Sequence, residues 1–271
     1  MSAHLSPVLT IAGSDSSGGA GIQADLKTFL ANGVYGMSAV TALTAQNTMG
    51  VTAIQEATPE FLAAELDAVF TDIPPRAVKV GMVASAALIE VIAAKLQGYH
   101  APHVVVDPVM VATSGAALIA GDAMEALKTK LLPLAEVITP NLPELTRLTK
   151  VGILNMETME QAARQAAEAF GVAVLAKGGH FKDGAAIDLL AFPDGRLESY
   201  AAPRSTNPNT HGTGCTLSSA IAANLAKGKP LAEAVGDAKA YLTGAIQADL
   251  DLGAGRGPLH HGWNLSGSFF A

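Results

Sequence analysis

The sequence predicts an α/β protein of the doubly wound class, with a mostly parallel central sheet, helices on both faces and a single domain over residues 1–271. First, short β-prone runs alternate along the chain with longer segments whose apolar residues recur at helical spacing. Second, 49% of the 271 residues are apolar and only 15% are charged, which is enough for a large core. Third, no linker or internal repeat divides the chain.

The first unit is a strand over residues 8–12, a glycine-rich loop over residues 14–21 and a helix. Ile22, Leu26 and Phe29 fall at helical spacing, and Gly33 follows at the stop position. Two further β-prone runs, 40–44 and 51–54, have no helix between them, so we expect a hairpin or flap there.

Thr58 and Pro59 are typical of a helix start, and the helix they begin ends before residues 74–75. After it, strands and helices alternate in the order that builds a parallel sheet. The expected strands are 77–80, 104–106, 137–138 and 172–176; the expected helices are 85–96, 123–132, 159–170, the segment after Gly212, and 231–250; a hairpin is expected around 193–195.

Residues 211–228 form a tight glycine turn that runs directly into a small, apolar helix. Gly212 and Gly214 let successive amides converge on one point, and Thr213 and Cys215 lie on the first turn, where free N–H groups favour an anion. The alternative is a glycine turn that caps an ordinary buried helix. Cys215 is the only cysteine; at a helix N-terminus its thiol pKa is expected to fall, which favours a base or nucleophile over a small apolar filler.

Composition excludes several classes of partner. The net charge is −7 and no segment concentrates basic residues, so neither nucleic acid nor an anionic membrane surface is expected as a partner. The N-terminus does not resemble a secretory signal, no run of about 18 apolar residues occurs, and one cysteine excludes an internal disulfide framework. We therefore expect a cytoplasmic protein.

Acids, an amide, a lysine and glycines follow the expected strands. Because ligands of doubly wound sheets bind beyond the carboxyl ends of the strands, these residues are candidates for a site. They are Gly13 with Asp25 one turn into its helix, Met82, Asp107, Val109, Asn141 with Glu144, and Lys177 with residues 178–180. The set fits metal-assisted phosphate chemistry; neither a P-loop nor a dinucleotide-binding glycine motif is complete, which argues against a P-loop enzyme and an oxidoreductase.

Several motifs together resemble the hydroxymethylpyrimidine and phosphomethylpyrimidine kinases of thiamine biosynthesis, in the ribokinase-like superfamily. They are A-G-S-D-S-S-G-G-A-G-I-Q-A-D-L-K-T, T-A-L-T-A-Q-N-T, V-K-V-G-M, D-P-V, T-P-N-x-x-E, K-G-G-H and H-G-T-G-C-T-L-S. The resemblance implies ATP- and Mg²⁺-dependent phosphorylation of 4-amino-5-hydroxymethyl-2-methylpyrimidine to its monophosphate and then its diphosphate. It also implies a homodimer, by analogy with this branch.

The resemblance assigns roles to individual residues. On the acceptor side, Gln46 would read the aminopyrimidine edge, and the ring would also meet Gly13, Ala20, Asp25, Met82 and Val109. On the phosphate side, Cys215 would be the base, with the turn Gly212, Thr213 and Gly214 around the transferring group; Asp107 and Glu144 would bind magnesium; Asn141, Lys177, Thr213 and Lys239 would bind ATP.

Each role has a structural alternative. Gln46 could satisfy its own turn, Asn141 and Glu144 form a good helix cap, and Lys239 could be a solvated helix lysine. Trp263 and residues 269–270 could pack on the body or on a second subunit. Five histidines without metal-ligand spacing are read as surface or loop residues: His100, His103, His180, His260 and His261. His211 differs because it precedes Gly212, where it could help to order the turn. The nearest rival activity is a pyridoxal or pyridoxine kinase; a catalytically silent sensing module is a third reading.

Overall fold

A computed structural model of the chain describes residues 5–110, 121–179, 181 and 185–266. Its main sheet has eight strands in the order β10-β9-β8-β7-β6-β5-β1-β2. Neighbouring strands are parallel from β8 to β2, and β9 and β10 add an antiparallel edge. The bounds are β1 (Pro7–Ala12), β2 (Tyr35–Val40), β5 (Ala77–Val80), β6 (Val104–Val106), β7 (Val137–Ile138), β8 (Ala173–Lys177), β9 (Ala186–Ala191) and β10 (Leu197–Ala202). The predicted doubly wound class is confirmed.

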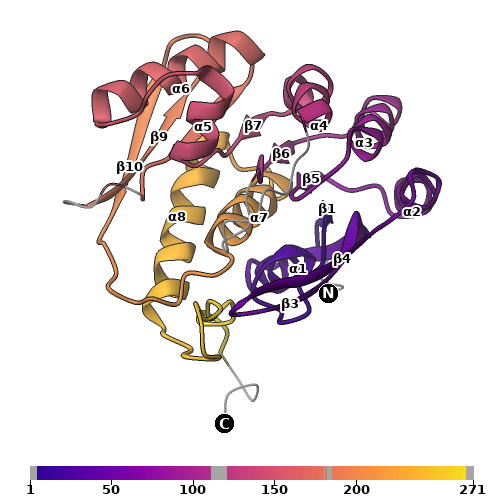
Figure 1. Cartoon of the computed structure of the whole chain (residues 1–271), viewed down its shortest axis with the longest axis horizontal. Coiled ribbons are helices and arrows are strands. Elements are labelled where there is room, and N and C mark those ends of the chain that lie inside the picture. Colours follow the sequence, from indigo (N-terminus) through magenta and orange to yellow (C-terminus); the bar gives the residue numbers. More distant parts are fainter. Residues whose placement is uncertain (1–4, 111–120, 180, 182–184, 267–271) are drawn as a thin grey trace.

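Helices cover both faces of this sheet (Figure 1). One core cluster joins one sheet face to α2 (Pro59–Asp72), α3 (Ala86–Gly98), α4 (Gly121–Ala126), α5 (Leu142–Thr149) and α6 (Met156–Phe170). A second cluster joins the other face to α1 (Gly21–Ala31), α7 (Thr213–Ala226) and α8 (Leu231–Gln247). After α4 the chain continues as a π-helical turn (Leu127–Leu131) and a 3-10 turn (Leu132–Leu134). The central strands β1, β5, β6, β7 and β8 are buried and mostly apolar because helices cover both faces of the sheet, whereas the edge strands β2 and β10 are partly exposed.

The expected flap is an antiparallel hairpin of β3 (Ala42–Asn47) and β4 (Gly50–Glu56), separate from the main sheet (Figure 1). Its register shifts between Ala45 and Gln46. The strand predicted over 40–44 is wrong in its bounds, because β2 ends at Val40 and β3 starts at Ala42. The prediction missed β2 because Gly36, Met37 and Ser38 carry no β-branched signal.

Helix ends follow the capping residues. The Thr58 side chain accepts a hydrogen bond from the Phe61 amide at 3.2 Å, as its position predicts. Gly33 and Gly228 have φ of 73° and 84°, the left-handed conformation expected just beyond a helix. The last helix ends at Gln247, three residues before its predicted end.

The segment after α8 packs back on the body. The Trp263 indole donates to the Tyr241 carbonyl oxygen at 3.0 Å, and the Asn264 amide donates to the Ala31 carbonyl oxygen at 3.1 Å. A parallel bridge pairs Pro258 with His211, the first residue of the glycine turn that leads into α7 (residues 211–214, called the α7 turn below). Trp263 therefore contacts its own chain; residues 269–270 lie outside the described part.

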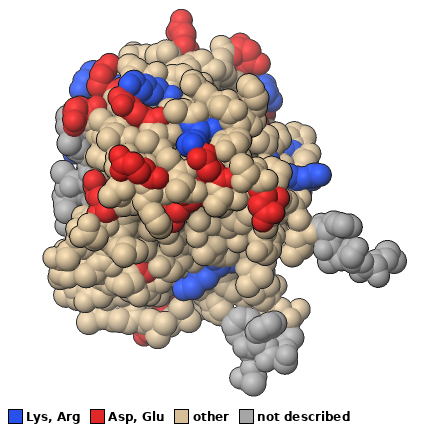
Figure 2. Space-filling view, turned by 90° about the vertical axis from the view of Figure 1, so that its right-hand side faces the viewer, with Lys and Arg blue, Asp and Glu red and all other residues tan. Residues whose placement is uncertain are grey.

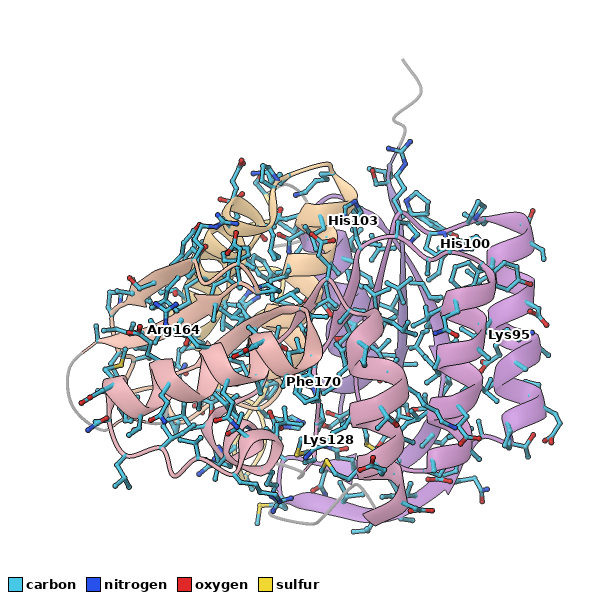
Figure 3. All side chains as sticks on the ribbon, turned by 90° about the horizontal axis from the view of Figure 1, so that it is seen from above. Lys95, His100, His103, Lys128, Arg164 and Phe170 are labelled. Carbon is cyan, nitrogen blue, oxygen red and sulfur yellow. The ribbon has the colours of Figure 1, made fainter. Side chains whose placement is uncertain are left out.

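On the outer surface, acidic and basic side chains intermingle over the face that carries α2 and α3 (Figure 2). His100 and His103 lie in the loop after α3, as expected (Figure 3). His103 is paired with Glu136 at 2.6 Å. In the described part of the chain, no helix is both long enough and apolar enough to cross a bilayer.

Candidate active site

One cavity of about 820 Å³ lies at the carboxyl ends of the parallel strands, between the β3–β4 hairpin, the start of α7 and one side of α8. This is where a doubly wound sheet is expected to bind its ligands. All but one of the predicted site residues line it: Gly13, Ala20, Gln46, Met82, Asp107, Val109, Asn141, Glu144, Lys177, Gly212, Thr213, Gly214, Cys215 and Lys239. The exception is Asp25.

The α7 turn requires glycine for two reasons. Gly212 has a φ of 85°, and a Cβ there would lie 1.9 Å from the Gly19 carbonyl oxygen. A Cβ on Gly214 would lie 3.1 Å from Asp107 Oδ2 and 3.3 Å from Lys177 Nζ. The N-terminal end of α7 therefore adjoins a carboxylate and an ammonium group, and its free amides add a partial positive charge.

Lys177 and Asp107 form an ion pair at the end of β8. Lys177 Nζ lies 2.8 Å from Asp107 Oδ1, which also accepts from the Thr139 hydroxyl at 3.1 Å. Burial alone would lower the pKa of Lys177, but the Asp107 and Glu144 carboxylates raise it above its usual value. Lys177 is thus a charged, largely buried cation at the wall of the cavity, as a phosphate-binding lysine must be.

Asn141 and Glu144 form the capping box that their spacing predicts. Asn141 Oδ1 accepts from the Glu144 amide at 2.9 Å, and Glu144 Oε2 accepts from the Asn141 amide at 2.8 Å. Burial raises the pKa of Glu144 to about 6; Lys177 lowers it and Asp107 raises it. The capping role is confirmed, and both residues still face the cavity.

Two carboxylates are a suitable donor set for magnesium, which proteins usually hold through one or two carboxylates together with substrate phosphates. Asp107 and Glu144 affect each other's environment electrostatically and both line the cavity. Among the described residues no group of three or more His, Cys, Asp or Glu side chains could form an all-protein metal site. The pair therefore fits an ion that arrives with a nucleotide.

The expected low pKa of Cys215 is contradicted. Burial raises the pKa of this thiol to about 11; Lys79 lowers it, while Asp25 and Asp107 raise it. A helix N-terminus does adjoin the sulfur, but loss of solvation and two nearby carboxylates outweigh it. A thiol with a pKa of about 11 is protonated at neutral pH.

The predicted contact between Asp25 and the acceptor stays a prediction; in this structure Asp25 does not line the cavity. Asp25 is fully buried, and its carboxylate accepts from Thr10 Oγ1 at 2.7 Å, Lys79 Nζ at 2.8 Å and Ser219 Oγ at 2.7 Å. It lies behind the cavity wall, where it holds Lys79. Lys79 borders the cavity and was missed, although a lysine within a buried strand was a signal available in the sequence.

Asp15 organises the loop after β1. Its carboxylate accepts from the Ser17 amide and hydroxyl, from the Gly19 and Ala20 amides, and from His211 Nε2 at 2.8 Å. Burial alone would raise the pKa of Asp15, but the bonds from His211 and Ser17 lower it to about 2. The link joins residues 196 positions apart, so no local pattern could have revealed it.

Gln46 faces the cavity from the irregular point of β3. Its backbone amide and carbonyl both bond Ser16 Oγ, at 2.8 and 2.7 Å. Its side-chain amide has one terminal atom 3.2 Å from Thr44 Oγ1 and the other 3.4 Å from His211 Nε2. The hairpin, the glycine loop and the α7 turn therefore meet at this residue.

Lys239 is neither solvated nor free. It is buried on α8 and pairs with Asp188 at 2.6 Å, while the other Asp188 oxygen accepts from the Gly178 amide at 2.9 Å. Lys239 and Asp188 both line the cavity at its α8 side. His180, the last residue of the K-G-G-H motif, lies outside the described residues.

Comparison with known proteins gives one family. A family model described as phosphomethylpyrimidine kinase matches residues 15–260. The hydroxymethylpyrimidine/phosphomethylpyrimidine kinase of Rhizobium meliloti is 55% identical over 258 residues, 93% of this chain and 96% of the relative. The thiamine biosynthesis bifunctional protein ThiED of Geobacter sulfurreducens is 53% identical over 254 residues, 94% of this chain, which spans about half (52%) of that relative's length.

Solved structures agree. A phosphomethylpyrimidine kinase from Clostridium difficile 630 superposes with a TM-score of 0.79 at 47% identity, covering 89% of this chain and 99% of its own. An ADP complex of Bacillus subtilis pyridoxal kinase superposes with a TM-score of 0.88 at 37% identity, covering 95% of this chain and 98% of its own. Both are kinases, and they share this fold.

Proposed function

Because the chain belongs to the phosphomethylpyrimidine kinase family, we propose that it uses ATP to phosphorylate 4-amino-5-hydroxymethyl-2-methylpyrimidine, first to the monophosphate and then to the diphosphate, in thiamine biosynthesis. One observation supports this above all. A single cavity holds an amide-bearing half around Gln46 and a charged half around Asp107 and Lys177, with Cys215 in its lining as well. Acceptor and nucleotide can therefore bind together in one site, as direct transfer requires.

On the phosphate side, the amides at the start of α7 and the Lys177 ammonium stabilise the negative charge of the transferring group. Asp107 and Glu144 would hold magnesium, which when bound would neutralise charge on the β- and γ-phosphates. Asp107 also holds Lys177 in place through its 2.8 Å ion pair. Asn141, Thr213 and Lys239 complete the proposed ATP contacts.

On the acceptor side, Gln46 binds the aminopyrimidine edge, Gly13 and Val109 offer backbone groups, and Ala20 and Met82 pack against the ring. We assign Cys215 as the base that takes the proton of the hydroxymethyl group. Because burial raises its pKa, the thiol must first release its own proton to solvent, and the neighbouring Lys79 ammonium stabilises the thiolate that remains. A positioned base of this kind contributes roughly 10²- to 10⁴-fold.

The second phosphorylation starts from a phosphate oxygen that is already anionic. No proton has to be removed, so this step depends on the α7 amides and Lys177 more than on Cys215. The two steps can thus share one cavity while placing different demands on the thiol.

Three finer features complete the proposal. The enzyme requires magnesium, acts as a homodimer and works in the cytoplasm. The two-carboxylate donor set supports the magnesium requirement. Analogy with this branch of kinases supports the homodimer, and a chain with one cysteine and no disulfide framework supports the cytoplasm.

A coupled assay of ADP formation tests the function. Purified protein with ATP and magnesium should turn over hydroxymethylpyrimidine and its monophosphate with higher kcat/KM than pyridoxal or pyridoxine. Higher kcat/KM on pyridoxal would replace the proposal with a vitamin B6 kinase, a reading that the pyridoxal kinase neighbours favour. Absence of turnover on every vitamer would indicate a sensing module.

A further inference from the structure

We propose that His211, held by Asp15, is a specificity-determining positioning residue that fixes the orientation of the Gln46 side-chain amide, with the amide oxygen toward His211 and the NH₂ group toward Thr44. The inference rests on the proposed function only for the identity of the acceptor ring. The orientation itself follows from hydrogen-bond donors and acceptors within the protein.

The hydrogen bond to Asp15 places a proton on Nε2 of His211. Nε2 of His211 lies 2.8 Å from Asp15 Oδ2, and both side chains are buried. An ionised carboxylate can only accept, so Nε2 must carry a hydrogen. Asp15 is ionised at neutral pH because its pKa is about 2. That one hydrogen points to Asp15, so Nε2 has no lone pair with which to accept an N–H from Gln46. The terminal atom of Gln46 that lies 3.4 Å from Nε2 must therefore be the amide oxygen, which takes a minor share of the same hydrogen.

Thr44 gives the same answer independently. Its hydroxyl lies 2.8 Å from the Ser14 carbonyl oxygen, which can only accept, so the single hydroxyl proton points there. The Thr44 oxygen can then only accept from the other terminal atom of Gln46, 3.2 Å away. That atom must be the NH₂ group.

Both constraints select one of the two amide orientations. If Nε2 of Gln46 faced His211 and Oε1 of Gln46 faced Thr44, the Gln46 NH₂ group would face the N–H of His211. The Gln46 oxygen would then face a Thr44 oxygen whose proton is already donated elsewhere. A half-turn about the last side-chain bond exchanges the two atoms without moving the group and satisfies both neighbours. Asp15 lies in the loop after β1, and His211 lies 196 residues later in the α7 turn. Their hydrogen bond helps to fix the orientation of the Gln46 amide.

The orientation determines what the cavity offers a ring. In this state one N–H of Gln46 donates to Thr44 and one oxygen lone pair faces the shared Nε2–H of His211, which leaves one donor and one acceptor in a fixed order. An aminopyrimidine edge presents a ring nitrogen acceptor beside an exocyclic amine donor and can pair with both. A pyridine ring without an adjacent amine leaves one group unpaired, at a cost in binding.

The test is a double-mutant cycle on vitamer preference. His211→Leu removes the donor, His211→Gln is the matched control that keeps an N–H in reach, and Gln46→Ala removes the amide that His211 is said to act through. The readout is the ratio of kcat/KM for hydroxymethylpyrimidine to that for pyridoxal, with KM for ATP and the melting temperature recorded for each variant. We expect His211→Leu to lower the ratio about tenfold or more, mainly through KM for the pyrimidine.

His211→Gln should recover most of that loss, and in the Gln46→Ala background His211→Leu should change the ratio less than twofold. An equal fall in kcat for both vitamers, or the same fall with and without Gln46, would overturn the proposal and leave His211 as a support for the α7 turn. Wild-type protein that prefers pyridoxal would instead count against the proposed function alone.

A second measurement needs no substrate. In ¹⁵N-labelled wild-type protein, nuclear Overhauser contacts from the Gln46 side-chain NH₂ protons should reach the Thr44 methyl group. Contacts from these protons to the His211 ring instead would refute the assigned orientation, whatever the enzyme phosphorylates.

Discussion

Replacing Asp25 by alanine tests whether this carboxylate is structural or binds the acceptor. In the wild-type protein the Lys79–Asp25 pair has no exposed side-chain surface and an N–O distance of 2.8 Å. The substitution leaves the Lys79 ammonium group in the core without its hydrogen-bonded carboxylate, and it also removes the acceptors of the Thr10 and Ser219 hydroxyls. We expect a large loss of stability.

The magnitude follows from the burial. Removing one partner of a buried ion pair costs about 3–5 kcal/mol, since the remaining charge is uncompensated. In a chain of this size that corresponds to a fall in melting temperature of about 6–20 °C. Removing both charges with Asp25→Leu and Lys79→Met together should restore most of the loss, because no buried charge remains.

Urea unfolding followed by circular dichroism is the assay, with Glu90→Ala as the matched surface control. Glu90 pairs with Lys130, and both side chains are about half exposed, so that variant should lose less than about 1 kcal/mol. The pH dependence sharpens the comparison. In the wild type, burial lowers the pKa of Lys79, but Asp25 and, to a smaller extent, Cys215 and Asp107 together raise it above its usual value. The lysine's contribution to stability is therefore fully present below about pH 10.4 and is lost as the pH rises above that value.

In Asp25→Ala the Asp25 carboxylate no longer raises the pKa of Lys79, and burial, the largest influence, outweighs the smaller effect of Asp107, so we expect this pKa to fall below that of the unfolded chain. The unfolded state then binds more protons, so the stability of the variant should rise between pH 7 and pH 10. Refutation would be a variant with unchanged melting temperature and pH dependence whose KM for the pyrimidine rises about tenfold. That outcome would restore Asp25 as a substrate-binding residue.

Three further predictions concern the α7 turn. Cys215→Ala should lose the first phosphorylation by roughly 10²- to 10⁴-fold in kcat and the second by less, and equal losses in the two half-reactions would contradict the general-base role. Because the pKa of Cys215 is about 11, its alkylation by iodoacetamide should accelerate about tenfold per pH unit from pH 7 to pH 9. The alkylation should also slow when the acceptor is bound. A rate that reaches a plateau below pH 8 would instead indicate a preformed thiolate. Gly212→Ala should lower the free energy of unfolding, measured in urea, by more than Gly33→Ala. Both glycines have positive φ, so each substitution costs about 1–2 kcal/mol for the strained backbone. Only the Cβ at position 212 would also collide, because it would lie 1.9 Å from the Gly19 carbonyl oxygen. Equal losses would show that the turn can shift to make room.

Local patterns predicted the layered fold because each unit contains residues that mark where its helix or strand begins and ends. Thr58 and Pro59 mark a helix start, Gly33 and Gly228 mark helix ends, and the buried strands read as apolar runs. The strand β2 escaped because it lies at the sheet edge and its residues lack a β-prone pattern. The extent of the domain, 1–271, stays a prediction, since the family match spans residues 15–260.

The site was predictable where residues end strands, because topology alone brings Asp107, Asn141 and Lys177 to one edge. Two properties were not. The pKa of Cys215 depends on burial and on carboxylates from other elements, which spacing along the helix does not encode. The role of Asp25 depends on Lys79, which approaches it from a strand 54 residues away.

The bridge between His211 and Pro258 has a consequence for how the protein is made. The His211 amide also donates to the Gly257 carbonyl oxygen at 3.2 Å, so the α7 turn is supported by chain that is synthesised about 46 residues after it. A nascent chain paused before residue 257 would contain all the sheet strands but would lack the segment that holds His211 opposite Asp15. Acceptor binding should therefore appear on the ribosome only after residue 258 has left the exit tunnel, later than the fold that surrounds it.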